Sequence, residues 1–344
     1  MKMSSKELKN LINETEVDSL RGYIYPAKAA KISPILKILL TNRCRNDCRY
    51  CFNNVKSNCS RFFISPRNLS KFFLSLYRKN LVRGLFLSSG IYKNPNFSQE
   101  KILETLFVLR KKLNYSGYIH AKVLPQADFS LIKELFKFSD RLSINLEYPA
   151  QKYLSSLSSK QLFEDLLRRL KLLSRLNRER KIKAGITTQF IVGAREVSDR
   201  EYLNLAYYLY KNLGLRRVYY SRFIPQKGTP LEEEREENPL RIKRLYEADF
   251  LIRDYNILPS QLLYDQKGNL PLEIEVKQAF ALKNRVLFPL NINKASYGEL
   301  IKVPGIGKER AKRILTLRKE AKISSFKKLE TLGIPKKTQR WIKF

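Results

Sequence analysis

The run Thr-Asn-Arg-Cys-Arg-Asn-Asp-Cys-Arg-Tyr-Cys-Phe, residues 41–52, contains three of the four cysteines of this 344-residue chain. The spacing is C-x3-C-x2-C, with Tyr50 directly before the third thiol. Three thiolates can hold three irons of a [4Fe–4S] cluster and leave the fourth iron open to a small molecule. The sequence therefore predicts a cluster bound by Cys44, Cys48 and Cys51.

Two other kinds of site also use clustered cysteines. A structural zinc site or a closed ferredoxin-type cluster needs a fourth ligand, and Cys59 is the candidate. Zinc sites usually combine paired C-x2-C units or histidines, whereas this chain has one such pair and a single histidine, His120. A secreted disulfide scaffold would carry more cysteines and a signal peptide, so we expect a cytoplasmic protein with reduced thiols.

The composition favours a folded protein that binds a polyanion. Hydrophobic residues make up 43% of the chain, which is enough for a packed core. No stretch approaches the ~20 apolar residues of a membrane span. Lys and Arg number 67 against 32 Asp and Glu, and residues 291–344 alone hold 15 Lys/Arg against four Glu. Nucleic acid is the polyanion we expect, against the alternatives of an anionic membrane surface or general lysine enrichment.

From residue 31 onward, short apolar or β-branched runs alternate with longer segments of helical periodicity. The expected strands are residues 34–41, 84–89, 117–124, 141–147, 183–192 and 216–223, and the expected helices are 67–80, 99–114, 130–138, 160–180, 198–213 and 240–255. Six β/α units predict a parallel sheet with helices outside it. The cysteine run follows the first strand, where the carboxyl ends of such strands carry functional sites.

The cysteine spacing with its aromatic resembles the signature of the radical SAM enzymes. This resemblance implies a fold of class α/β, a partial (β/α)6 TIM-like barrel, here followed by a small all-α helix-hairpin-helix domain. It also implies two cofactors, a [4Fe–4S] cluster and S-adenosylmethionine, together with an external electron donor. In that superfamily the open iron holds the methionine amino and carboxylate groups, and reduction yields a 5′-deoxyadenosyl radical. Tyr50 would lie near the adenine.

The resemblance also suggests residues around S-adenosylmethionine. The expected cofactor contacts are Ser88, Ser89 and Gly90 after the second strand, Ser143, Asn145 and Glu147 along the fourth, Gln189, Ile191 and Gly193 on the fifth, and Phe223 after the sixth. The run from Gln189 is similar to the superfamily's G-x-I-x-G-x-x-E motif, with Gln in place of the first Gly. Candidates for substrate or catalytic contact are His120, Lys122, Tyr220 and Arg222.

The tail contains the hairpin Val303-Pro-Gly305-Ile306-Gly307, followed by a basic helix from Lys308. Ser296 and Glu299 predict a capping box on the preceding helix. The pattern h-x-G-I-G-x-x-x-A matches the helix-hairpin-helix motif, whose backbone N–H groups cradle a phosphate. The residues expected to bind nucleic acid are Val303, Gly305, Ile306, Gly307, Lys308, Arg310 and Lys312. Residues 326–337 form a second copy without the second glycine; a helical module that docks protein is the alternative.

The barrel signature and this tail together resemble a family of DNA modification and repair radical SAM proteins, often encoded beside a uracil-DNA glycosylase-like protein. The resemblance implies an enzyme that makes the 5′-deoxyadenosyl radical and acts on DNA. RNA or tRNA modification is one alternative, and a non-enzymatic DNA-binding protein with a structural or redox-sensing cluster is another. The expected domains are an N-terminal helical extension (1–30), the barrel (31–256), a linker that wraps it (257–290) and the helix-hairpin-helix domain (291–344).

Overall fold

The computed structural model describes residues 24–27, 33–159 and 162–344. Seven strands form one sheet in chain order, and the last six are parallel neighbours, which confirms the predicted α/β class with six parallel strands. The strands are β1 (Ile24–Ala27), β2 (Ser33–Leu39), β3 (Gly84–Ser88), β4 (Tyr118–Lys122), β5 (Arg141–Ser143), β6 (Gly185–Val192) and β7 (Arg217–Arg222). Strand β1 pairs antiparallel with β2. It falls within the predicted N-terminal helical extension, of which residues 1–23 and 28–30 lie outside the described residues.

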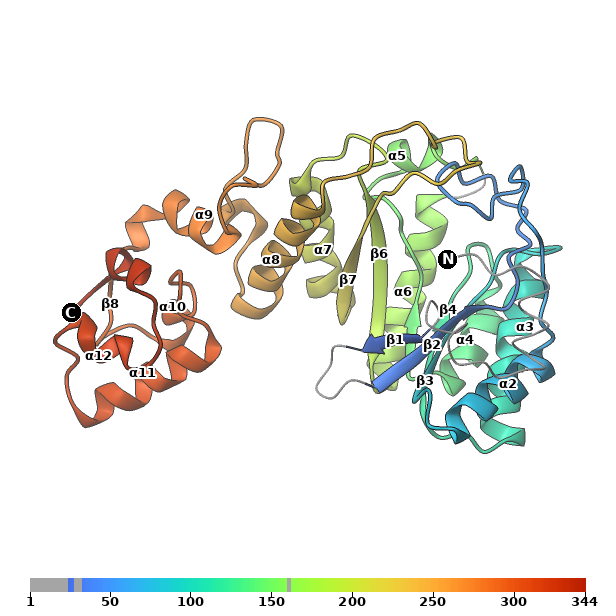
Figure 1. Ribbon diagram of the computed structural model, residues 1–344, viewed down its shortest axis with the longest axis horizontal. Helices are drawn as coiled ribbons and strands as arrows, with labels where there is room; N and C mark the ends of the chain where they lie inside the picture. The colour runs from blue at the N-terminus through green and yellow to red at the C-terminus, as the bar shows by residue number, and fades with distance from the viewer. Residues whose placement is uncertain (1–23, 28–32, 160–161) are drawn as a thin grey trace. The chain divides into compact units, whose positions relative to one another are not determined.

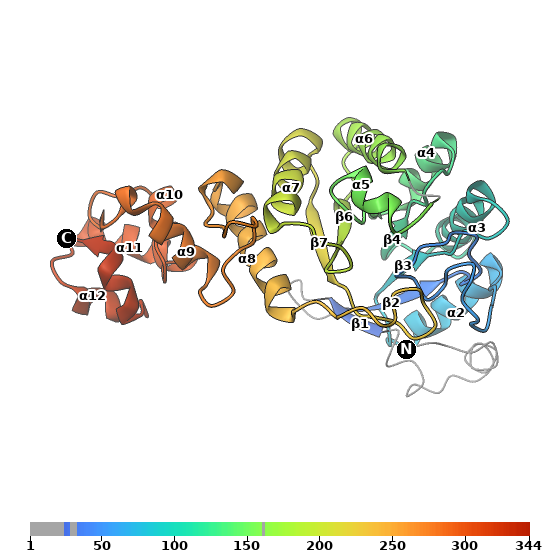
Figure 2. The ribbon, with the colours of Figure 1, turned by 90° about the horizontal axis from the view of Figure 1, so that it is seen from above.

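A helix follows each parallel strand in chain order, and the sheet is curled (Figures 1 and 2). Figure 2 shows α2, α3, α4 and α6 in an arc outside the strands. The helices of this part are α2 (Pro66–Arg78), α3 (Pro95–Phe107) with a π-helical turn η2 (Val108–Lys112), α4 (Phe129–Phe138), the short α5 (Gln151–Ser155), α6 (Phe163–Glu179), α7 (Asp199–Leu213) and α8 (Pro239–Tyr255).

Three helices begin with the same local signal, a short polar residue followed by proline. The side chains of Ser65, Asn94 and Asn238 cap α2, α3 and α8 by accepting backbone N–H bonds. Proline then occupies the first helical position, where its missing N–H costs nothing and its fixed φ suits the helix. These starts are therefore encoded locally.

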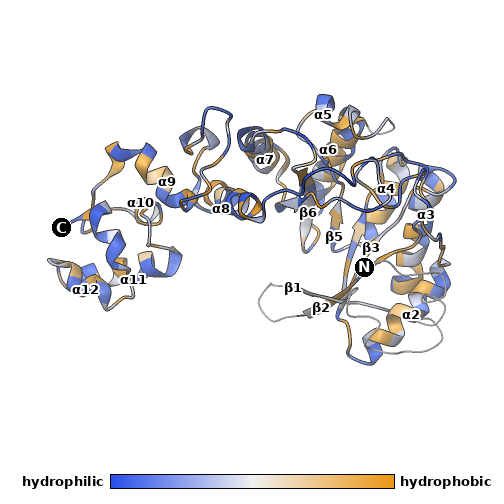
Figure 3. Ribbon diagram, turned by 45° about the horizontal axis from the view of Figure 1, so that its top comes forward, coloured by the Kyte–Doolittle hydropathy of each residue, from blue (hydrophilic) through white to orange (hydrophobic). Residues whose placement is uncertain are grey.

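Alternation along the strands divides the sheet into two faces. Leu36 and Ile38 of β2, and Leu85 and Leu87 of β3, are buried in the core against the helices. The helices meet them with amphipathic surfaces, seen as interleaved hydrophobic and hydrophilic residues in Figure 3. The intervening residues, such as Lys37, point to the inner, concave face. The fold thus buries one face in a packed core and leaves the other to build a site.

Contacts divide the chain into two compact units, one comprising residues up to 195 with 209–237 and the other 196–208 with 238–344. Beyond α8, the second unit contains η3 (Pro259–Gln261), α9 (Val276–Lys283), η4 (Arg285–Leu287), β8 (Leu290–Asn291), α10 (Tyr297–Leu300), α11 (Lys308–Glu320), α12 (Phe326–Glu330), η5 (Lys336–Trp341) and β9 (Ile342–Lys343). The predicted domain boundaries at 256 and 290 stay predictions. In the described ranges no helix has the length and apolarity to cross a membrane.

Candidate functional site

The cysteine loop lies at the carboxyl ends of the strands, at the top of Figure 1. Backbone bonds join it to the turn after β3: the Gly90 N–H donates to Thr41 O at 2.8 Å, and the Arg45 N–H donates to Ile91 O at 2.8 Å. A Cβ at Gly90 would overlap the Arg43 carbonyl. Glycine at this position therefore lets the two loops pack backbone to backbone.

One guanidinium holds the far part of the cysteine loop. Arg61 donates to the carbonyl oxygens of Asn42 at 2.7 Å, Asn53 at 2.9 Å, Asn54 at 2.6 Å and Ser57 at 2.9 Å. The loop is neither helix nor strand, so these carbonyl oxygens have no regular backbone hydrogen bonds to accept. The Arg61 guanidinium, with its five N–H donors, supplies the missing hydrogen bonds.

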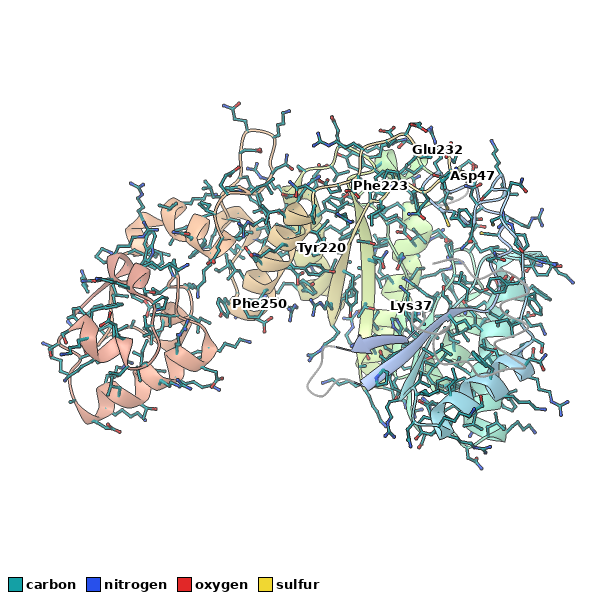
Figure 4. All side chains as sticks on the ribbon, in the orientation of Figure 1. Lys37, Asp47, Tyr220, Phe223, Glu232 and Phe250 are labelled. Atoms are coloured by element: carbon teal, nitrogen blue, oxygen red, sulfur yellow. The ribbon has the colours of Figure 1, made fainter. Side chains whose placement is uncertain are left out.

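The segment after α5 supports the loop from another side. The Asp47 carboxylate, labelled in Figure 4, accepts from the Ser159 hydroxyl at 2.5 Å and the Ser158 hydroxyl at 3.1 Å. These bonds lower the pKa of Asp47 despite its partial burial. The Ser158 hydroxyl also lies 3.5 Å from the Cys48 sulfur. Asp47 therefore positions the hydroxyl that contacts a predicted iron ligand.

A cavity of about 240 Å³ opens inside the cysteine loop. Ten residues predicted from the sequence line it: Cys44, Cys48, Cys51, Tyr50, Ser88, Ser89, Gly90, Lys122, Asn145 and Glu147. Leu39, Asn46 and Asn53 also line it and were not predicted. The three thiols thus meet at one space, while Cys59 is absent from its lining.

A chain of polar side chains also lines the cavity. The Lys122 ammonium donates to the Asn145 side-chain oxygen, and the Asn145 amide donates to Glu147 Oε1 at 2.9 Å. Burial lowers the pKa of Lys122 and raises that of Glu147, while their opposite charges partly offset both effects. Glu147 Oε2 is buried with no hydrogen-bond partner among the described residues. A buried, unsatisfied carboxylate oxygen is costly unless a bound group donates to it.

The three thiols that line the cavity match the ligand set of an open [4Fe–4S] cluster, in which each thiolate binds a different iron. Burial raises the pKa of Cys48 to about 11 and that of Cys51 to about 12, so binding must supply the positive charge that makes them thiolates.

The tail begins with the predicted capping box. The Ser296 hydroxyl accepts from the Glu299 N–H at 3.3 Å, and the Glu299 carboxylate accepts from the Ser296 N–H at 2.7 Å, which confirms it. Helix α10 then leads through the hairpin to α11, whose N-cap is Gly307, with no side-chain cap. The amino end of α11 therefore presents N–H groups that no side-chain cap satisfies.

The two glycines of the hairpin have different surroundings. Gly305 has φ +87°, and a Cβ there would overlap the buried Thr338 hydroxyl. Gly307 has an ordinary φ of −95°, and the nearest atom to its Cβ would be the Tyr255 hydroxyl at 3.9 Å. Gly305 is needed for packing and Gly307 is not. Val303 and Ile306 are fully buried, so they support the hairpin from inside.

The hairpin cations are oriented by neighbours. Lys308 pairs with Asp254 at 2.6 Å, Arg310 donates to Gly305 O at 2.9 Å, and Lys312 pairs with Glu309 at 3.2 Å. These three cations therefore stand around the amino end of α11. The Lys277 ammonium of α9 donates to Ile306 O in the hairpin.

Residues 38–209 match the sequence model of the radical SAM superfamily, half of the chain. The chain belongs to the radical SAM superfamily. Residues 289–338 match the model of the helix-hairpin-helix motif, which spans both copies seen in the tail. Radical SAM enzymes use a [4Fe–4S] cluster and S-adenosylmethionine, and three cysteines of this chain meet at the cavity described above. No curated protein sequence matches the chain.

Two solved structures share the fold at low identity. Methylornithine synthase (PylB) is 14% identical, with 96% of this chain and 97% of that chain covered and a TM-score of 0.51. The hydrogenase maturase HydG from Carboxydothermus hydrogenoformans is 16% identical, with 64% and 51% covered and a TM-score of 0.50. The chain thus spans about half the length of that maturase.

Other predicted residues of the radical SAM barrel lie outside the cavity lining. Tyr220 packs on Phe190 with ring centroids 6.2 Å apart and is 3% exposed, on the face opposite Tyr219. Strand alternation turns it toward the helices, so Tyr220 is withdrawn as a substrate contact. Arg222 lies 3.7 Å from Glu236 in an ion pair.

Four predicted residues at the ends of β6 and β7 are also absent from the cavity lining. Ile191 and Phe223 are buried, and the Phe223 N–H donates to Val192 O at 2.8 Å. Gly193 has φ +108°, and its missing Cβ makes room for Glu237. Gln189 is half-buried on the inner face. Adenine contacts by these residues stay a prediction.

Proposed function

We propose that this radical SAM protein cleaves S-adenosylmethionine reductively and uses the resulting radical on nucleic acid, in DNA modification or repair. The observation that carries the proposal is the meeting of Cys44, Cys48 and Cys51 at one cavity that Lys122 and Glu147 also line. When bound, the cluster and S-adenosylmethionine supply an electron and a hydrogen-abstracting radical. An external donor would provide that electron.

The residues of the cavity have separate tasks in this proposal. Cys44, Cys48 and Cys51 would bind three irons. Glu147, with its unpartnered oxygen, would accept hydrogen bonds from the methionine ammonium or the ribose, and Lys122 would pair with the carboxylate. The apolar side chains of Leu39 and Ile91, which also line the cavity, would exclude water from the radical.

The choice of DNA rests on the tail. Its hairpin presents N–H groups at the start of α11, and Lys308, Arg310 and Lys312 stand around them. Such contacts hold a phosphate backbone without reading sequence. RNA is the second candidate, because it offers the same phosphates. Competition of duplex DNA and RNA at stated salt concentrations separates the two.

The decisive experiment is anaerobic reconstitution with iron and sulfide, followed by reduction and measurement of 5′-deoxyadenosine. The parent should produce it and Cys44→Ala should not, while Cys59→Ala should retain both cluster and product because Cys59 does not line the cavity. A cluster that forms in the parent, ignores S-adenosylmethionine and is lost in Cys59→Ala would instead support a closed structural or redox-sensing site.

A uracil-DNA glycosylase-like partner is also proposed, from the family resemblance. Mixing such a protein with the radical SAM protein, with and without duplex DNA, and measuring complex formation by analytical ultracentrifugation would test it. Sedimentation as two independent species under both conditions would remove the partner from the proposal.

A further inference from the structure

A group of exposed cations gathers beside the first cysteine. Arg43 and Arg45 of the cysteine loop and Lys93 of the turn after β3 are all exposed. The Arg43 guanidinium lies 5.2 Å from the centre of the Tyr92 ring and donates to the Tyr92 hydroxyl at 3.2 Å. Lys93 Nζ lies 6.0 Å from the centre of the same ring, and Arg45 donates to Lys93 O at 2.5 Å. These three cations and Tyr92 are here called the outer patch.

The outer patch surrounds an apolar centre. The Tyr92 ring centroid lies 6.1 Å from that of Phe63 and 5.8 Å from that of Phe97. Phe63 is 36% exposed, and Val55, which lines a hollow together with Tyr92, is 50% exposed. Exposed apolar side chains within a ring of charged ones are typical of a surface that binds another protein.

The segments that build the outer patch contain few acidic residues. Residues 41–63 include five Lys or Arg and one acidic residue, Asp47, and residues 89–97 include no Asp or Glu. The Asp47 carboxylate accepts hydrogen bonds from Ser158 and Ser159, as described above. The outer patch is therefore strongly basic and complements an acidic surface.

The outer patch borders a predicted iron ligand. Its hollow has a volume of about 390 Å³ and is lined by Arg43, Cys44, Arg45, Val55, Arg61 and Tyr92. Cys44 also lines the cavity where the three thiols meet. A protein bound to the outer patch would thus lie against a ligand of the cluster. Because electron transfer slows steeply with distance, this position suits an electron donor.

We propose that the outer patch binds a small acidic protein that carries one electron, and that the electron enters the cluster on the Cys44 side. This rests on the proposed reductive cleavage of S-adenosylmethionine and specifies the donor and its binding surface. The reduced carrier loses one electron and is oxidised, and the cluster gains that electron and is reduced; no proton or other group moves. Opposite charges speed the encounter, and a small interface releases the oxidised carrier.

Nucleic acid is the other anion that such a basic surface attracts. The shared lining of Cys44 favours the electron carrier, because a strand bound there would gain nothing from a cluster ligand. The two occupants are separated by the experiment below.

An acidic flavodoxin is the probe, because it contains no iron and its flavin hydroquinone anion gives up one electron to become the neutral semiquinone. Binding of dye-labelled, oxidised flavodoxin to the reconstituted protein would be followed by fluorescence anisotropy. We expect saturable binding by the parent, with an affinity that falls as the salt concentration rises.

Arg43→Glu and Lys93→Glu should each weaken this affinity roughly tenfold at low salt, and the loss should shrink at high salt. Lys171→Glu makes the same charge change on the exposed surface of α6, which follows β5, and should match the parent. Circular dichroism and iron content would check each variant. Lys93→Glu, which lies outside the cysteine loop, suffices if Arg43→Glu does not hold the cluster.

Stopped-flow mixing with flavodoxin hydroquinone gives a second readout. Below saturation, semiquinone should form roughly tenfold more slowly with each of the two outer-patch variants than with the parent. Excess dithionite should reduce the cluster to the same extent in all of these proteins, because a small reductant needs no docking surface.

Unchanged flavodoxin affinity in both outer-patch variants would overturn the inference, as would the absence of saturable binding by the parent at low salt. If both variants instead lost affinity only for a duplex or single-stranded oligonucleotide, the outer patch would belong to nucleic acid and the inference would also fail. Failure of the proposed function appears separately, as missing 5′-deoxyadenosine in the parent reduced with dithionite.

Discussion

The two glycines of the tail hairpin should respond in opposite ways to alanine. In Gly305→Ala the new methyl would sit at φ +87° and overlap the hydroxyl of Thr338, which is fully buried. In Gly307→Ala the backbone is already in an ordinary conformation, and the methyl would be 3.9 Å from the nearest atom, the Tyr255 hydroxyl. The first variant should lose stability and the second should lose binding.

The magnitudes follow from these surroundings. A left-handed conformation costs a non-glycine residue roughly 1–2 kcal/mol, and forcing a methyl into a packed site adds about 1–3 kcal/mol. Gly305→Ala should therefore destabilise the tail by about 2–5 kcal/mol. Gly307→Ala should change stability by less than about 1 kcal/mol. Its methyl would stand where a phosphate must approach the N–H groups of α11, so affinity for duplex DNA should fall roughly tenfold.

The single tryptophan allows the tail to be followed alone. Trp341 is 6% exposed and packs on Phe288 with ring centroids 5.6 Å apart. Urea unfolding monitored by its selectively excited fluorescence reports the helix-hairpin-helix region. DNA affinity would be measured by fluorescence anisotropy of a labelled duplex at one fixed salt concentration.

The reasoning would be refuted if Gly305→Ala unfolded at the parent's urea midpoint, or if Gly307→Ala unfolded as early as Gly305→Ala. Equal DNA affinity of parent and Gly307→Ala, with both folded, would remove the hairpin from the nucleic-acid interface.

Further predictions concern other parts of the chain. Arg61→Met should leave the cysteine loop carbonyls unsatisfied and lower the iron bound per chain after reconstitution; iron content equal to the parent's would contradict the role of this guanidinium. Burial lowers the pKa of Lys277 in the folded protein to about 7, below the pKa of a lysine in the unfolded chain. Between pH 7 and about pH 10, Lys277 is therefore protonated in the unfolded chain and neutral in the folded one. Tail stability should therefore rise with pH there, by up to about 1.4 kcal/mol per unit, and Lys277→Met should flatten the profile obtained from urea unfolding at several pH values. Phe73→Ala, at a fully buried site, should destabilise the barrel by about 3–5 kcal/mol in circular dichroism melts; a loss below 1 kcal/mol would be incompatible with its packing. Lys308→Met should reduce the slope of log affinity for duplex DNA against log salt by about one, and an unchanged slope would exclude a phosphate contact.

Much of the site follows from local patterns. The cysteine spacing, the loop after β3 and the alternation of Asn145 and Glu147 predict residues that the structure brings to one cavity. These residues come together because strand order and alternation are short-range, and because the carboxyl ends of parallel strands must meet at one edge. Helix α9 is a feature that the sequence pattern missed, since prolines on both sides made residues 257–290 look irregular.

By itself, then, the sequence determined the parallel β/α order, the thiols for a cluster and the hairpin with its capping box, because each depends on spacing along the chain. Only the tertiary structure decided that Gly305 is confined by Thr338 while Gly307 is open, that Tyr220 faces the helices, and that Arg43 lies over the Tyr92 ring. Those relations depend on strand register and on residues tens of positions apart. Such contacts arise from packing the whole core, and no local pattern encodes them.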